Sequence, residues 1–198
     1  LLPLKDLPHV ADLTRLDEEE KLLKFLKRID NELKKRKDLF AEYSVASLSQ
    51  YEQKTGEKLP VILTIMDGFD AIKDSPKEEV IEACMNRILR EGSSLGCYLI
   101  VTALRANSLK ISMSSNVSTK MALFLVEDHA VKDVIGRNAL IPQEIFGRGQ
   151  VNDDKTYEIQ IYLPSEGDED IERLRHLEEE VAEMDKAWTG QRPKAIPM

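Results

Sequence analysis

The fold of this chain is decided by the stretch Leu59-Pro60-Val61-Ile62-Leu63-Thr64-Ile65-Met66-Asp67-Gly68. Its apolar run is continuous rather than alternating, which is typical of a strand that is buried on both faces of a parallel sheet. The run ends at Asp67-Gly68, two residues that favour a turn. The sequence therefore predicts a buried parallel strand with an aspartate at its carboxyl end.

A helix and a second strand follow this run at the spacing of a βαβ unit. Ser75-Pro76-Lys77-Glu78 opens the helix with a capping serine, a proline and an acidic first turn, and Gly92 is expected to end it. A second apolar run over residues 97–102 predicts another buried strand. We expect the two strands to be parallel, because a helical crossover joins them.

Two helices are predicted before the first strand. Apolar residues recur at helical spacing over about residues 17–43 and indicate a long amphipathic helix. A shorter helix begins near Ser47 and ends at Gly56, a residue suited to the left-handed position after a helix. The basic run Lys34-Lys35-Arg36-Lys37 lies within the long helix, and we interpret it as a solvated face.

The rest of the chain is predicted to form a third strand, an antiparallel hairpin and two helices. A third strand is expected at residues 120–126, and a short helix at residues 128–135. The segments that flank residues 152–155 alternate like an antiparallel hairpin. An acidic helix covers about residues 168–188. Because the sequence has no internal repeat and no low-complexity linker, we expect residues 1–198 to be a portion of one α/β domain.

The composition restricts the classes of function. The chain has 28 Lys and Arg against 36 Asp and Glu, a net charge of −8, whereas proteins that grip a nucleic-acid backbone usually carry a basic excess. No apolar run approaches the roughly 20 residues of a membrane-spanning helix. Cys84 and Cys97 lie in apolar stretches without metal-ligand spacing and are predicted to be buried thiols. We expect no nucleic-acid ligand and no metal site built from histidine and cysteine.

Asp67 is the first candidate for a functional residue. A buried strand that ends in an aspartate is typical of the Walker B motif, in which the carboxylate holds Mg²⁺ through the water shell of the ion. The same pattern also occurs where an aspartate only ends a strand at a turn. This motif by itself does not decide between the two interpretations.

Five segments, in the order found in the family, resemble the ATPase domain of FtsK/SpoIIIE-type motors. They are residues 39–51, the strand that ends at Asp67, residues 96–102, Asn116-Val117-Ser118-Thr119-Lys120, and Ile135-Gly136 with Gly147-Arg148-Gly149. With the long charged helix that precedes the first of them here and in the family, they cover about Lys21 to Val151. The resemblance implies a RecA-like P-loop NTPase fold with three layers, a parallel sheet flanked by helices. Within the family, the acidic balance and the ending after the GRG segment resemble the last ATPase domain of the EssC/EccC motors of type VII secretion.

This resemblance implies a membrane protein whose cytoplasmic tail carries the ATPase domains and assembles as a homo-hexamer. It implies ATP and Mg²⁺ as cofactors. The implied partners are other ATPase domains of the same protein and the exported WXG100 or Esx proteins, which are small helical hairpins. The chain would then be a cytoplasmic domain of a cell-membrane protein.

The chain also departs from the family pattern. No G-x-x-x-x-G-K-[ST] loop occurs in it, so we expect a C-terminal portion of the domain, without the phosphate-binding part. Gly68 stands where the family has a catalytic glutamate, and Ala103-Leu104 replaces the Thr-Gln pair that senses the γ-phosphate. Arg105 is retained from the same segment. These departures predict weak or absent hydrolysis of ATP.

The resemblance gives candidate residues for two roles. Asp67, Gly68 and Arg105 would line the nucleotide, with Asp67 on the magnesium side, and no residue is assigned as catalytic. Lys120, which replaces an arginine of the family, and Arg148 would lie at contacts between subunits.

Three functions remain open. The first is a degenerate nucleotide-binding domain that couples nucleotide state and substrate recruitment to export. The second is an active FtsK-type DNA translocase, and the third is a protein-interaction domain that has lost nucleotide binding. For an exported peptide, the sequence offers two apolar candidates, residues 107–118 and the part of the last helix around Met184 and Trp188.

Overall fold

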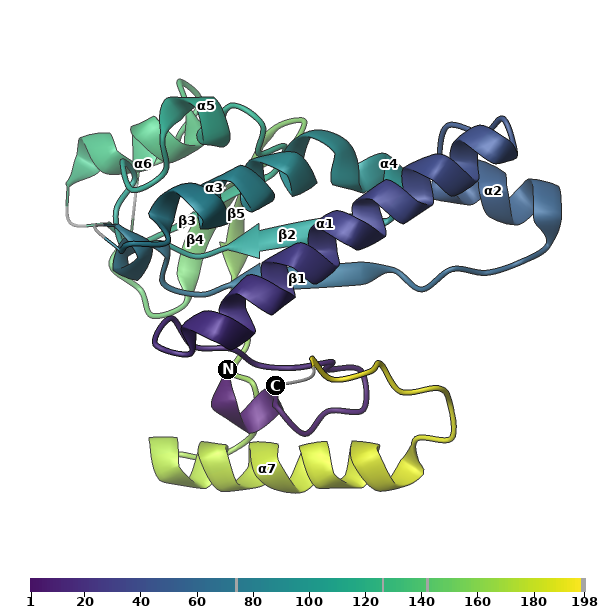
Figure 1. Cartoon of the computed structure of the whole chain (residues 1–198). Coiled ribbons are helices and arrows are strands. Elements are labelled where there is room, and N and C mark those ends of the chain that lie inside the picture. Colours follow the sequence, from purple (N-terminus) through teal and green to yellow (C-terminus); the bar gives the residue numbers. More distant parts are fainter. Residues whose placement is uncertain (74, 126, 142, 197–198) are drawn as a thin grey trace. The chain divides into compact units, whose positions relative to one another are not determined.

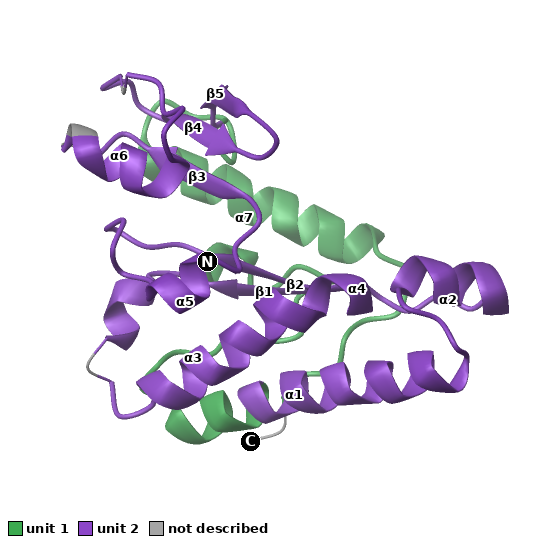
Figure 2. Ribbon diagram, turned by 90° about the horizontal axis from the view of Figure 1, so that it is seen from above, with its two compact units in different colours: residues 1–25, 162–198 green, residues 26–161 purple. Residues whose placement is uncertain are grey.

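The computed structural model describes residues 1–73, 75–125, 127–141 and 143–196, and the last residue of the predicted strand 120–126 lies outside them. The chain divides into two compact units (Figure 2). Unit 1 comprises residues 1–25 and 162–198, and unit 2 comprises residues 26–161. Each unit is described by itself.

Unit 2 contains the predicted parallel pair. β1 (Ile62–Met66) and β2 (Cys97–Val101) are parallel, and the register runs from Ile62 opposite Cys97 to Met66 opposite Val101. Figures 1 and 2 show α3 (Glu78–Arg87) and the long helix on one side of this pair. Thr64 and Cys97 are buried on one face. The predicted burial of both faces is wrong, because Leu63, Ile65, Tyr98 and Ile100, on the other face, are 44–52% exposed.

The connection between the two strands is longer than predicted. α3 continues through a π-helical turn (Ile88–Gly92) into α4 (Ser93–Leu95), so Gly92 does not end the helix. Gly92 instead allows a close approach, since a Cβ there would lie 2.3 Å from the carbonyl oxygen of Cys97. The helix ends at Gly96, whose φ of 72° places it in the left-handed region.

The two helices before β1 form as predicted. α1 (Glu19–Glu42) begins in unit 1 and continues into unit 2, where Leu26, Leu33 and Phe40 are buried. α2 (Leu48–Thr55) is capped by Ser47, whose side chain accepts a hydrogen bond from the backbone N–H of Gln50, and is followed by a left-handed Gly56.

The interpretation of the basic run of α1 as a solvated face is wrong for Arg36. Its side chain is only 1% exposed, and it donates hydrogen bonds to the carbonyl oxygens of Leu95 at 2.8 Å and Pro60 at 2.7 Å. It also pairs with Glu32 at 2.8 Å, one turn earlier on the helix. Arg36 therefore ties α1 to the segments that lead into both strands.

The remaining strands of unit 2 form an antiparallel sheet. β3 (Lys120–Leu123) pairs with β4 (Arg148–Asn152), which pairs with β5 (Thr156–Gln160). The hairpin between β4 and β5 confirms the prediction. α6 (Asp128–Ile135) packs Val131 and Ile135 on Ala122 of β3. The fold is thus mixed α/β, and the described strands form two sheets, of which only the two-stranded one is parallel.

The serine-rich stretch 107–118 is partly helical, which the sequence did not predict. α5 (Ile111–Ser114) buries Met113 and leaves Ile111 88% exposed. Lys110, just before this helix, forms ion pairs with Glu82 at 2.6 Å and Glu78 at 3.5 Å on α3. These ion pairs connect the stretch to α3.

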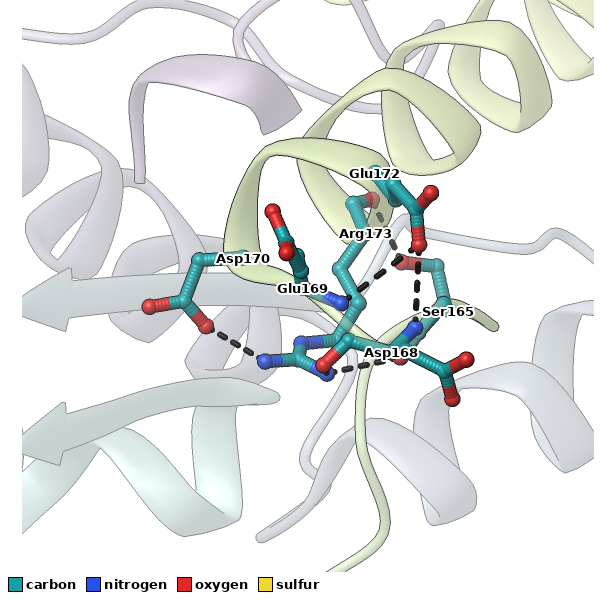
Figure 3. Close-up of polar contacts among 7 residues, drawn as sticks. Ser165, Asp168, Glu169, Asp170, Glu172 and Arg173 are labelled. Atoms are coloured by element: carbon teal, nitrogen blue, oxygen red, sulfur yellow. Dashed lines mark hydrogen bonds and ion pairs between the residues drawn. The ribbon is translucent and has the colours of Figure 1, made fainter.

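Unit 1 contains a short 3₁₀ turn, η1 (Leu2–Leu4), and the predicted acidic helix, α7 (Asp170–Ala187). Figure 3 shows the start of α7, where Glu169 and Glu172 form a reciprocal capping box. Arg173 pairs with Asp170 at 2.5 Å in the same turn. The capping box satisfies backbone N–H groups that a helix start leaves without a partner.

The two ends of the chain meet within unit 1. His9 lies edge-on to Trp188 with ring centroids 4.4 Å apart, and the backbone N–H of Ile196 donates to Asp12 at 3.1 Å. Val181 of α7 is buried, whereas Met184 is half exposed.

Candidate functional site

The carboxyl ends of β1 and β2 meet at Asp67 and Thr102. The hydroxyl of Thr102 donates to the Asp67 carboxylate at 2.6 Å and accepts the backbone N–H of Gly68 at 2.9 Å. The carbonyl of Thr102 accepts the N–H of Phe69 at 2.8 Å. Thr102 therefore fixes the loop that carries Asp67, although no role was predicted for this residue from the sequence.

Gly68 determines how the chain leaves β1. It has φ 70° and ψ 56°, a left-handed conformation that costs a residue with a side chain about 1–2 kcal/mol. The short 3₁₀ helix η2 (Phe69–Ile72) follows, and its Phe69 and Ile72 are buried to 2% and 0% exposure. The backbone at position 68 thus suits glycine and not the glutamate of the family pattern.

Asp70 joins the loop after β1 to the loop after β2. Its carboxylate accepts the backbone N–H of Leu104 at 2.6 Å and the hydroxyl of Ser108 at 2.5 Å. These two hydrogen bonds, with a smaller contribution from the charge of Arg105, hold the pKa of Asp70 below its usual value. Asp70 is therefore more than the cap of a local turn, since it holds residues 102–108 against β1.

The residues predicted to line a nucleotide lie at this edge. Asp67 and Gly68 follow β1, and Arg105 belongs to the loop that Asp70 holds. Leu104 is 80% exposed and offers no polar side chain where the family pattern has a glutamine. An exposed carboxylate beside a hydroxyl suits Mg²⁺, which binds proteins through one or two carboxylates and keeps several waters.

The two candidates for contacts between subunits lie elsewhere, on the antiparallel sheet. Lys120 begins β3 and is half-buried. The guanidinium of Arg148 on β4 pairs with Glu158 of β5 and donates to Gln160 at 3.0 Å. The structure does not bring these two residues to the edge that carries Asp67, and their role stays a prediction.

Other chemistry is not indicated. Cys84 and Cys97 are buried free thiols as predicted, and burial raises the pKa of Cys84 to about 12, so this thiol is not a nucleophile at neutral pH. Within the described ranges, no three His, Cys, Asp or Glu residues are grouped as a metal site. The same part of the chain contains no helix long and apolar enough to cross a membrane.

The fold and this edge together define the class of protein: a mixed α/β portion of the kind found in ATPase domains, with an aspartate directly after a parallel strand. No family model matches the chain. The type VII secretion system protein EssC of Staphylococcus aureus strain Mu50 is 35% identical over all 198 residues, which are 13% of the length of that relative.

Solved structures agree with this relation. The chain superposes on EssC (ATPases 2 and 3) from Geobacillus thermodenitrificans with a TM-score of 0.90 and 34% identity, and covers 38% of that structure. A structure of the cytoplasmic domain of EssC gives a TM-score of 0.84, also at 34% identity, with 39% of it covered. The whole of the present chain is covered in both cases.

A more distant structure shares the fold. Thermomonospora curvata EccC (ATPases 2 and 3), solved in complex with a signal sequence peptide, gives a TM-score of 0.81 at 19% identity, with all of this chain and 36% of that one covered. The present chain is therefore homologous, over its full length, to an ATPase portion of the EssC/EccC proteins of type VII secretion systems. It spans about an eighth of the length of the curated relatives.

Proposed function

We propose that this chain is the C-terminal portion of a degenerate nucleotide-binding domain, the last ATPase domain of a membrane-anchored type VII secretion motor. The observation that carries the proposal is Asp67 at the carboxyl end of β1, followed by glycine in place of an acid. The complete domain would bind ATP with Mg²⁺ and couple its nucleotide state to the recruitment and export of WXG100-type proteins.

Binding of the metal is the role proposed for Asp67. The phosphates of ATP would provide the other ligands of Mg²⁺, as is common in ATPases. The phosphate-cradling loop would come from a part of the domain outside these residues, because the chain contains no such motif. Arg105, held near this edge through Asp70, would add positive charge toward the phosphates.

Hydrolysis would be weak because two groups that act on the attacking water or the γ-phosphate are replaced. Gly68 has no side chain to orient or activate water. The side chain of Leu104 cannot form a hydrogen bond, and the backbone N–H of this residue already donates to Asp70. A domain of this kind would bind ATP but hydrolyse it slowly.

Recruitment of an exported peptide is supported by the signal sequence peptide present in the Thermomonospora structure. Ile111 is 88% exposed and Met184 is half exposed, so each can add apolar contact area. Met113, also within residues 107–118, is buried and adds nothing to such a surface. Peptides that form amphipathic helices bind such apolar surfaces.

Nucleic acid is not the proposed ligand. With a net charge of −8, the chain repels a polyanion, and DNA binding relies on the release of counterions by basic residues. The likeness to the cytoplasmic domain of EssC supports a place on the cytoplasmic side of the membrane. Assembly as a homo-hexamer with neighbouring ATPase domains is part of the proposal.

The test is a titration of the purified chain with two fluorescent probes, a C-terminal signal peptide of a WXG100 protein and a duplex DNA, at low and high salt. We expect the peptide to bind with an affinity that changes little with salt, because apolar burial drives it. Met184→Glu and Ile111→Glu locate the contact, with Ile141→Glu as an exposed control.

Tight DNA binding that weakens steeply with salt, together with no peptide binding, would overturn the secretion proposal. That result would favour the alternative function, an FtsK-type DNA translocase. If the peptide binds and Mg·ATP does not bind the complete domain, the chain is a protein-interaction domain instead.

A further inference from the structure

Thr102, directly after β2, directs its backbone and side-chain polar groups at one short segment. Its backbone N–H donates to the carbonyl oxygen of Met66 at 3.0 Å, and its own carbonyl accepts the N–H of Phe69 at 2.8 Å. Its hydroxyl accepts the N–H of Gly68 at 2.9 Å and donates to the carboxylate of Asp67 at 2.6 Å. A single residue after β2 therefore contacts four consecutive residues at the end of β1.

The backbone contacts and the hydroxyl contacts of Thr102 differ in what they require. Any residue except proline has the backbone groups that bond to Met66 and Phe69. The contacts with Gly68 and Asp67 need a side chain that accepts and donates at the same time, as a hydroxyl does. Because the oxygen accepts the N–H of Gly68, the single hydroxyl hydrogen is available for Asp67. The branched Cβ of threonine also restricts χ1, which limits the directions that the hydroxyl can take.

The hydroxyl of Thr102 engages one oxygen of the Asp67 carboxylate. The hydrogen bond is made to Oδ1. Within the described ranges, no hydrogen bond or ion pair engages the second oxygen, Oδ2. Since Asp67 is exposed, the hydroxyl is the contact that orients its carboxylate, with one oxygen held by the protein and the other open to water.

A carboxylate oriented in this way suits a divalent cation that binds through oxygen. Mg²⁺ keeps several waters and is bound through one or two carboxylates. Carboxylates that hold metals are themselves hydrogen-bonded, and removal of the bonding partner typically weakens metal binding by about 10–100-fold. The residue after Asp67 is a glycine, which has no side chain to orient this carboxylate. The hydroxyl of Thr102 fills that role from the neighbouring strand.

We infer that Thr102 is a positioning residue for a divalent cation: its hydroxyl holds Oδ1 of Asp67, so that Oδ2 is left for the water shell of the ion. This inference rests on the proposed role of Asp67 in binding Mg²⁺. It does not require ATP hydrolysis, recruitment of a peptide or assembly of subunits.

The test is a titration of the purified chain with Mn²⁺ alone, without ATP, followed by nuclear magnetic resonance. Mn²⁺ shares the preference of Mg²⁺ for oxygen ligands, and its unpaired electrons broaden the amide signals of nearby residues. The amide signals of Gly68 and Phe69 report on the site. Those of residues 178–180 on the acidic helix α7 report on non-specific attraction of the ion to the negative surface.

Four variants separate the hydroxyl from other contributions. Thr102→Val has a similar shape and keeps both backbone contacts but lacks the hydroxyl, whereas Thr102→Ser keeps it. Asp67→Asn removes the charge that attracts the ion. Thr55→Val is the matched control, because the hydroxyl of Thr55 makes the same kind of bridge at the end of α2. It accepts the N–H of Glu57 at 3.1 Å and donates to the carbonyl of Tyr51 at 2.8 Å.

In the wild type we expect Mn²⁺ to broaden the signals of Gly68 and Phe69 and excess Mg²⁺ to reverse the effect. Asp67→Asn should abolish this broadening and leave that of α7 unchanged. Thr102→Val should need about tenfold more Mn²⁺ for the same broadening, while Thr102→Ser and Thr55→Val should match the wild type. Denaturant unfolding verifies that each variant is folded, and Thr102→Ala replaces Thr102→Val if the latter does not fold.

Four results would overturn the inference. Thr102→Val binds Mn²⁺ at least as tightly as the wild type, or Thr102→Ser binds it as weakly as Thr102→Val. The signals of Gly68 and Phe69 broaden no more in the wild type than in Asp67→Asn. Finally, Thr55→Val weakens the broadening as much as Thr102→Val, which would mean that loss of any bridging hydroxyl has this effect.

Failure of the proposed function would be seen in a different measurement, the Mg·ATP affinity of the complete domain. If the complete domain binds no ATP but the Mn²⁺ pattern holds, Thr102 positions a cation in a domain that has lost nucleotide binding. If ATP binds, Asp67→Ala weakens it and Thr102→Val leaves Mn²⁺ binding unchanged, only the role of Thr102 is lost.

Discussion

Asp70 makes two hydrogen bonds that cross from the loop after β1 to the loop after β2. One partner, Ser108, is only 6% exposed, so its hydroxyl would lose its acceptor if Asp70 were removed. The carboxylate thereby fixes the position of Arg105 relative to Asp67. At the scale of single residues, this contact shapes the candidate site more than any motif residue except Asp67.

We predict that Asp70→Ala lowers the free energy of unfolding by about 1–3 kcal/mol, because a buried hydroxyl and a backbone N–H lose their acceptor. Denaturant unfolding of the chain measures this change. Asp38→Ala, at an exposed position of α1, is the control and should change stability by less than about 0.5 kcal/mol. Equal stability of the two variants would show that Asp70 is only a turn residue.

Acid should remove the contribution of Asp70. Its pKa in the folded chain lies below the ordinary value of 3.8, so folding favours the carboxylate. The stability difference between wild type and Asp70→Asn is therefore full above that value and shrinks as the pH falls through the lowered pKa. Unfolding curves between about pH 7 and pH 2 test this. A difference that widens on acidification would contradict the assignment.

Single-residue roles were predictable only where a motif marks them. Asp67 was found because an aspartate at the end of an apolar strand is a recognisable pattern. Thr102 and Ser108 were missed, because their importance comes from partners 35 and 38 positions away in sequence. The parallel pairing of the two strands places Thr102 beside Asp67, and that pairing was itself predicted.

At the scale of elements, Arg36 joins α1 to the entrances of both strands. Its buried guanidinium satisfies the carbonyl groups of Pro60 and Leu95, which precede β1 and β2. Gly96 leaves room for it, since a Cβ there would lie 3.2 Å from an Nη atom of Arg36. The long helix is therefore fixed by polar contacts to the segments that lead into β1 and β2.

We predict that Arg36→Ala lowers the free energy of unfolding by about 3 kcal/mol, because the buried carbonyl of Leu95, the partly buried carbonyl of Pro60 and the Glu32 carboxylate lose their donor. Arg36→Lys should recover only part of the loss, since an ammonium lacks the guanidinium fork. Thermal or denaturant unfolding measures both. Lys35→Ala, at the exposed neighbouring position, is the matched control. If Lys35→Ala lowered the free energy of unfolding by the same amount, the loss would come from the helix surface and not from the buried contacts of Arg36.

Elements were predicted well where local signals agree. The cap at Ser47, the stop at Gly56 and the apolar runs of β1 and β2 all act within a few residues and all hold. The helix end predicted at Gly92 was wrong. A glycine is needed there because the backbone of Cys97 lies too close for a side chain. The burial of Arg36 depends on carbonyl groups that are far away in sequence. The basic run around Arg36 therefore did not indicate that this residue is buried.

For the whole molecule, the predicted helices and strands form, but the described strands make two small sheets instead of one wide sheet. The mixed α/β class follows from the sequence, whereas the wider parallel sheet expected from the family resemblance is not formed by the described strands. A continuous apolar run indicates that a strand is suited to burial, but it does not identify the residues that cover the strand. Leu63, Ile65, Tyr98 and Ile100 are accordingly 44–52% exposed although their strands are apolar throughout.

We propose that the ATPase domain containing this chain binds nucleotide without fast turnover. The measurement that decides this is the steady-state ATPase rate and the Mg·ATP affinity of the complete domain, with wild type and Asp67→Ala compared. We predict measurable binding that Asp67→Ala weakens, and turnover well below the roughly 1–10³ s⁻¹ of typical enzymes in both proteins. A wild-type rate within that range, abolished by Asp67→Ala, would contradict the account.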